Sequence, residues 1–233
     1  METTLSMSAI RTDDRRSPAP AARRVKTWHI FAIVSLLTIA LTWYGTRFVL
    51  THDVYARLRA DQLDVTRIER QFALRRQNVP LQLAIVPVAV ALRIGFVALC
   101  LQFLLLSGGV EARFTRIFRA VALAYPVLLL AYFALLLEMR SLPLDAIDSD
   151  TMTRMPGSIV AGIRDLRGIN AGVQQLLRCL NVFEFAWLVV LFYGIVRFAN
   201  VSRRAAASSA LATWVLIAGL QSALVAYLAR IAR

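Results

Sequence analysis

One arginine, Arg93, lies near the middle of a long apolar stretch, 81–106, and is the sharpest chemical feature of the chain. A charge at the centre of a bilayer costs about 2.5 kcal/mol or more, so such a residue is by default a functional candidate with an acidic partner. Glu138 and Glu184 lie at the ends of other apolar stretches and are the candidate partners, and Glu184 is favoured because it lies within the predicted span 182–200. We therefore predict an intramembrane polar site of Arg93, Glu184 and Glu138.

Two interpretations of Arg93 remain open at this point. If its membrane span begins nearer Val88, the arginine lies only about 7–8 Å inside the hydrocarbon, and its long side chain reaches the surface. Otherwise Arg93 is either paired with a carboxylate or takes part in handling an anionic group or a lipid headgroup.

Other residues offer little chemistry. The only histidines, His29 and His52, are separated by about 35 Å in a straight helix, and the two cysteines, Cys100 and Cys179, are too few for a disulfide framework or a metal site. The chain has no nucleophile elbow, phosphate-binding glycine loop or metal-binding histidine pair. The sequence therefore predicts a protein that is not an enzyme and has no metal site and no cofactor.

The elements that must position Arg93 are five apolar stretches. Crossing the hydrocarbon core takes about 20 mostly apolar residues in a helix. The chain has 58% hydrophobic residues and a mean hydropathy of +0.61, and five of its apolar stretches reach this length. We predict an all-α fold, an integral membrane bundle of five transmembrane helices formed by a single domain, 27–233. The expected spans are 27–50, 81–106, 117–137, 182–200 and 209–229.

Two polar segments flank these spans. Residues 1–26 are rich in Ser, Pro, Ala and Arg, which predicts a disordered basic tail. A short basic turn of Ser and Ala is expected at 201–209, between the fourth and fifth spans.

The segment 51–79 is polar but patterned, and its apolar residues have helical spacing. We predict one amphipathic extracytoplasmic helix that could lie on the membrane, pack on its own protein or pair with a second copy. Its apolar face would consist of Leu58, Val65 and Phe72, with Val54 and Ile68 on the neighbouring line.

The charge of the chain, +13, comes from 26 arginines and one lysine. They are spread over every loop and form no stripe on a soluble face, which argues against nucleic acid as a partner. Basic loops beside apolar helices attract anionic lipid headgroups at about 1 kcal/mol per charge. The expected partners are therefore the bilayer and its anionic headgroups, together with another membrane protein or a second copy.

The same charges bear on source and orientation. The preference for arginine over lysine indicates a GC-rich genome and a bacterial source. Basic residues are denser in the short segments on the N-terminal side, and such segments tend to stay in the cytoplasm. We predict a bacterial inner membrane protein whose N-terminus is cytoplasmic.

Two stretches carry a family resemblance. They are LSGG at 106–109 followed by FTRIFR at 114–119, and NVFEFAWLVVLFYGI at 181–195. They resemble the connection into the third helix and the start of the fourth helix in the Yip family of polytopic membrane proteins. The resemblance implies five spans and a cytoplasmic N-terminus. Eukaryotic members of that family assist vesicle trafficking and bind small GTPases.

Together these features give two functional hypotheses. The first is a non-enzymatic polytopic inner-membrane protein of the Yip type that organises the membrane or envelope, or binds a membrane partner. The alternative is a transporter or permease component that handles an anionic or lipid substrate through Arg93.

Overall fold

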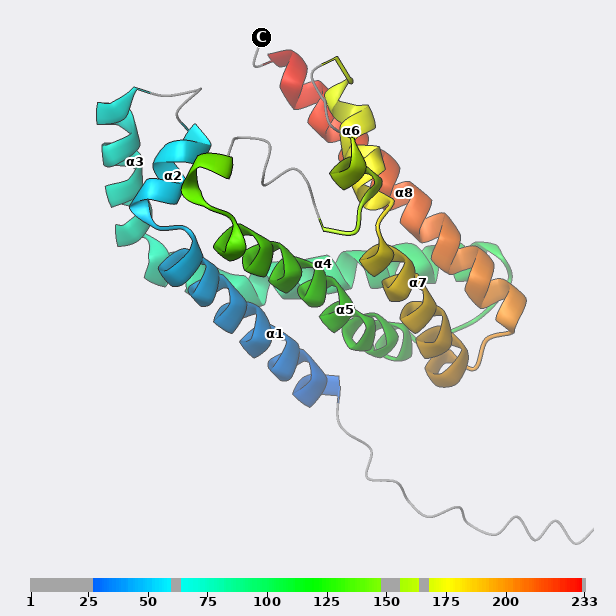
Figure 1. Cartoon of the computed structure of the whole chain (residues 1–233). Coiled ribbons are helices and arrows are strands. Elements are labelled where there is room, and N and C mark those ends of the chain that lie inside the picture. The colour runs from blue at the N-terminus through cyan, green and yellow to red at the C-terminus, as the bar shows by residue number, and fades with distance from the viewer. Residues whose placement is uncertain (1–26, 60–63, 148–155, 164–167, 232–233) are drawn as a thin grey trace, which may run out of the picture.

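The computed structural model describes residues 27–59, 64–147, 156–163 and 168–231, and within them it is helical with no β-strand. The predicted tail, 1–26, lies outside the described residues. Five helical segments are long and apolar enough to cross a bilayer. The prediction of an all-α, multi-pass membrane bundle is confirmed (Figure 1). The segments are α1 (Thr27–Tyr44) with the π-helical turn η1 (Gly45–Val49), α4 (Val79–Ser107), α5 (Phe114–Ser141), α7 (Val182–Gly194) with η5 (Ile195–Ala199), and α8 (Arg203–Ile231).

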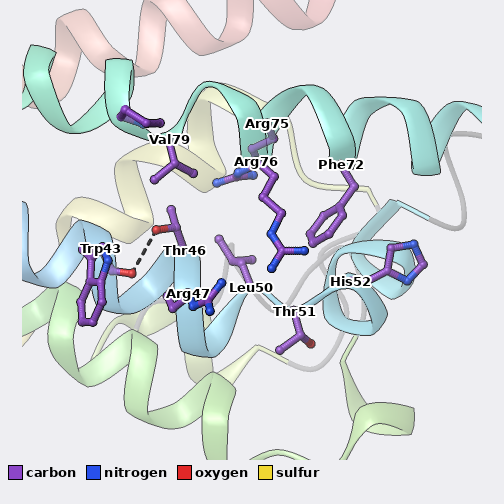
Figure 2. A pocket seen from close by; sticks show the side chains of 11 residues that line it. Trp43, Thr46, Arg47, Leu50, Thr51, His52, Phe72, Arg75, Arg76 and Val79 are labelled. Carbon is purple, nitrogen blue, oxygen red and sulfur yellow. Dashed lines mark hydrogen bonds between the residues drawn. The ribbon is translucent and has the colours of Figure 1, made fainter.

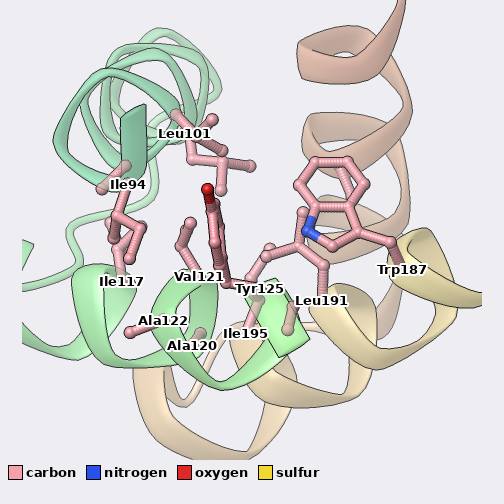
Figure 3. Packing of buried hydrophobic residues seen from close by; sticks show 14 of the residues in the cluster. Ile94, Leu101, Ile117, Ala120, Val121, Ala122, Tyr125, Trp187, Leu191 and Ile195 are labelled. Carbon is pink, nitrogen blue, oxygen red and sulfur yellow. The ribbon is translucent and has the colours of Figure 1, made fainter. Parts of the chain in front are cut away.

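Helix α5 is the centre of the bundle and packs against α1, α4 and α7. Close approach of α5 and α7 depends on Gly194, because a Cβ there would lie 3.1 Å from the Cβ of Ala120. Large apolar side chains from three helices fill the space around this contact (Figure 3). They include Ile94 and Leu101 of α4, Ile117, Val121 and Tyr125 of α5, and Trp187 and Leu191 of α7.

Helix α8 lies at the edge of the bundle, against α4, α7 and the short helix α6 (Ala171–Cys179). At Gly172 the two helices nearly touch, because a Cβ there would lie 2.9 Å from the backbone oxygen of Ser222. Figure 1 shows α6 lying along the C-terminal half of α8.

The prediction of a single amphipathic helix over 51–79 is wrong, because the segment forms two helices, α2 (His52–Arg59) and α3 (Val65–Gln77). Asp64 has extended backbone angles, and its carboxylate accepts a hydrogen bond of 2.8 Å from the backbone N–H of Val65. Asp is one of the residues most favoured at this capping position, so a new helix begins there.

The predicted apolar face also needs correction. Val65 is 67% exposed, whereas Val54, Leu58 and Ile68 are buried. Val54 and Leu58 pack with residues of η1 and α5, so α2 packs on its own protein. Their neighbours in this cluster are Val49, Leu50, Leu135, Leu136, Met139 and Ile147.

The turn predicted at 201–209 is too long, since α8 begins at Arg203. Asn200 has φ +58°, in the left-handed region, and follows the end of η5. The residues after Arg204 are mostly alanine, the strongest helix former, so the helix starts at once. We call the end of the bundle where α1 begins the N-side, and it includes Thr27, the 108–113 loop and the 200–202 turn. The opposite end, which we call the far side, includes α2, α3 and α6.

Candidate functional site

The structure brings two of the three predicted site residues together. Arg93 of α4 and Glu184 of α7 line one cavity of about 40 Å³, which Gln221 of α8 also lines. Glu184 is half-buried, and among the described residues no direct ion pair joins it to the exposed Arg93 guanidinium. The central carbon of that guanidinium lies 5.6 Å from the ring centroid of Tyr125 on α5. Arg93 of α4 therefore contacts α5 through Tyr125 and lines the same cavity as Glu184 of α7.

Glu138, the third predicted residue, is not part of this cluster. It follows Tyr125 by 13 residues on α5, which places it about 20 Å further along the helix axis. Its side chain is exposed at the far-side end of α5. Of the two acidic candidates, Glu184 is the one near Arg93.

Further polar groups tie α6 to this cluster. The Gln221 Oε1 atom accepts from Gln175 Nε2 at 3.5 Å and from Cys179 Sγ at 3.8 Å. Burial and, next, the Glu184 carboxylate raise the pKa of the Cys179 thiol, while Arg178 opposes this shift. The sequence showed these polar residues but not that α6 folds back along α8, so their meeting could not be foreseen.

The size of the cavity limits its chemistry. A cavity needs roughly 10–15 Å³ to hold one water, so a cavity of about 40 Å³ has room for a few waters. Ligand pockets commonly measure about 300–1,000 Å³. The Arg93 cluster can therefore fix helices relative to one another, but its cavity does not accommodate a headgroup.

A larger hollow, the far-side groove, lies among η1, α2, α3 and the start of α4 and measures about 710 Å³ (Figure 2). Its basic side chains are Arg47, Arg75, Arg76 and His52, and no carboxylate of the described residues lines it. The remaining lining residues are Trp43, Thr46, Leu50, Thr51, Phe72, Val79 and Pro80.

Contacts between α2 and α3 hold one wall of the far-side groove in place. The Tyr55 hydroxyl lies 3.1 Å from Gln71 Oε1 and can donate a hydrogen bond to it. The Arg75 guanidinium carbon lies 5.8 Å from the centre of the Tyr55 ring. The rings of His52 and Phe72 meet edge to face, with centroids 5.1 Å apart. These contacts keep α3 beside α2, so Arg75 and Arg76 converge on the same hollow as Arg47.

No pattern in the sequence predicts this groove. Arg47 and Arg75 are far apart in the chain and meet only because α3 returns to the end of α1. Among the described residues, no group of three or more His, Cys, Asp and Glu side chains could hold a metal ion. No protein-family model, curated protein or solved structure matches this chain.

Proposed function

We propose that this multi-pass protein organises the membrane without catalysis, as a Yip-type protein of a bacterial inner membrane, and that it does so by holding anionic lipid headgroups in the far-side groove. The observation that carries the proposal is the convergence of Arg47, Arg75 and Arg76 on a hollow of about 710 Å³ with no described carboxylate in its lining.

The chemistry of the lining suits a lipid phosphate. A guanidinium is planar and donates paired hydrogen bonds to phosphate oxygens. Each arginine near an anionic surface contributes about 1 kcal/mol to binding. Trp43 lies at the groove, and tryptophan is enriched where a membrane meets water. Val79 and Pro80 open the apolar span α4 at the same place, so an acyl chain can continue from the groove along the helix.

The proposed orientation follows from charge density in the short loops. With the N-terminus in the cytoplasm, the far-side groove faces the extracytoplasmic leaflet. Lipids of that leaflet, or a membrane partner that presents a phosphate there, are then the proposed ligands.

Transport through Arg93 is the weaker hypothesis. The cavity beside Arg93 measures about 40 Å³, so a headgroup would enter only if α4, α7 and α8 separated. The far-side groove needs no such rearrangement, and this difference in size favours the organising function.

Site-specific crosslinking in native membranes tests the proposal. A photoreactive amino acid replaces Phe72, which lines the groove, or Leu74, which lies on the same helix, is 49% exposed and does not line it. We expect the probe at position 72 to capture phospholipid enriched in anionic headgroups, and the probe at position 74 to capture much less. Capture of protein alone at position 72 would argue for a partner site in place of a lipid site.

A further inference from the structure

A second basic pocket lies on the N-side, at the opposite end of the bundle from the far-side groove. It measures about 500 Å³ and forms where the starts of α1 and α5 meet η5. Seven residues line it: Thr27, Thr115, Arg116, Arg119, Arg197, Phe198 and Asn200. We call this hollow the N-side pocket.

Arg119 is held in place within the N-side pocket. Its guanidinium carbon lies 4.8 Å from the ring centroid of Phe198, a distance typical of a cation–π contact. Its side chain is half-buried, and its Nε atom is buried without a hydrogen-bond partner among the described residues. A buried donor without an acceptor is unfavourable, so a ligand oxygen that accepts from it is favoured. The pocket thus contains a fixed cation with an unused donor.

The other lining groups are also donors. Arg116 and Arg197 add two guanidiniums, Thr27 and Thr115 add hydroxyls, and no described carboxylate lines the pocket to neutralise them. Helices α1 and α5 begin here, and Arg113, at the capping position of α5, provides no side-chain cap for its free N–H groups. The positive ends of both helix dipoles therefore face this side, where an anion is favoured.

We propose that the N-side pocket binds a phosphate group through Arg116, Arg119 and Arg197. Three guanidiniums with hydroxyl donors match the several oxygens and the delocalised charge of a phosphate monoester or diester. The same chemistry is offered by an anionic phospholipid headgroup in the N-side leaflet and by a soluble phosphate compound. This site shares no lining residue with the far-side groove and does not depend on the function proposed for it.

The test uses the purified full chain carrying Arg75→Gln and Arg76→Gln, so that the far-side groove contributes little. In this background, Arg116→Gln/Arg197→Gln is compared with the control Arg113→Gln/Arg204→Gln, which removes the same charge from exposed N-side positions outside the pocket. Two probes are titrated separately. Short-chain phosphatidylglycerol is followed by native mass spectrometry, with phosphatidylcholine as the neutral reference, and inorganic pyrophosphate is followed by calorimetry.

We expect at least one probe to bind the background protein and the control equally, and to bind the Arg116/Arg197 variant about thirtyfold more weakly. Binding of the lipid alone identifies a headgroup site, and binding of pyrophosphate identifies a site open to soluble phosphate. The proposal is overturned if neither probe binds, or if the control loses as much affinity as the pocket variant. Arg119→Lys keeps the charge but loses the planar guanidinium, and we expect weaker binding with unchanged thermal unfolding; unaltered affinity would exclude Arg119 from the site.

Discussion

Arg93 and Glu184, which are far apart in the sequence, line the same small cavity between α4, α7 and α8. Arg93 also lies over the ring of Tyr125 on α5. The cluster therefore joins the central helix of the bundle to three helices around it. The helices that it joins present the far-side groove and the N-side pocket at the two ends of the bundle.

Breaking this pair should destabilise the protein. Arg93→Leu leaves the half-buried Glu184 carboxylate without its nearby cation, but Arg93 itself is exposed, so the loss should stay below about 3–5 kcal/mol, the cost of breaking a fully buried pair. We expect Arg93→Leu to unfold more readily in a denaturation series in bicelles, and Arg93→Leu/Glu184→Leu to regain most of the loss. Glu138→Gln, at the exposed end of α5, is the control and should change stability by less than about 0.5 kcal/mol. If Arg93→Leu is as stable as the parent protein, the Arg93 side chain does not pair with Glu184 and only extends to the membrane surface.

Leu58 and Val65 were both predicted to lie on one apolar face, but only Leu58 is buried. Leu58 is 7% exposed and packs against η1 and α5, whereas Val65 is 67% exposed. Leu58→Ala should therefore lower the free energy of unfolding by about 2–5 kcal/mol, and Val65→Ala should change it by less than about 0.5 kcal/mol. Thermal unfolding of the two variants in detergent measures the difference. Equal effects would place both residues on one packed face, contrary to the split into α2 and α3.

The Cys179 thiol should react slowly with maleimide near neutral pH. Burial and the Glu184 carboxylate raise its pKa, so less of the reactive thiolate is present at a given pH. In a Cys100→Ser background, labelling should accelerate as pH rises above 8. The exposed control is Thr66→Cys in a chain also lacking Cys179, which should label much faster at pH 8. Adding Glu184→Gln to the Cys179 protein should speed its labelling at pH 8; an unchanged rate would show that the carboxylate does not act on the thiol.

Orientation can be measured with reporter fusions. We expect a reporter in the 108–113 loop or the 200–202 turn to be cytoplasmic, because the short basic segments gather on that side. Reporters before Asp64 and at the C-terminus should be extracytoplasmic. A cytoplasmic C-terminus would contradict either the orientation or the number of spans.

The spans could be predicted from sequence because their signal is local. Length and hydropathy within 81–106 or 117–137 are enough to show a membrane helix, whatever packs against it. The helix start at Asp64 was missed because apolar residues at intervals of seven continue past it, although a capping residue begins a new helix there.

The candidate site was predicted only in part, since it depends on which helices are neighbours. Arg93 was recognisable as a costly intramembrane charge, and Glu184 could be favoured over Glu138 because it lies within a predicted span. That Arg93 and Glu184 line one cavity with Gln221 depends on how α4 packs with α7 and α8. The convergence of Arg47 with Arg75 depends on the return of α3 towards η1, which no local pattern encodes.

The affinity of the far-side groove for anionic lipid tests the proposed function most directly. Native mass spectrometry of the full chain, titrated with phosphatidylglycerol, compares Arg75→Gln/Arg76→Gln with Arg67→Gln/Arg70→Gln. Both pairs lie on α3 and remove the same charge, but only the first lines the groove. Both carry Arg116→Gln/Arg197→Gln so that the N-side pocket contributes little. We predict about thirtyfold weaker binding for the groove pair and an unchanged affinity for the control. Equal affinity of the two variants would contradict the proposed function.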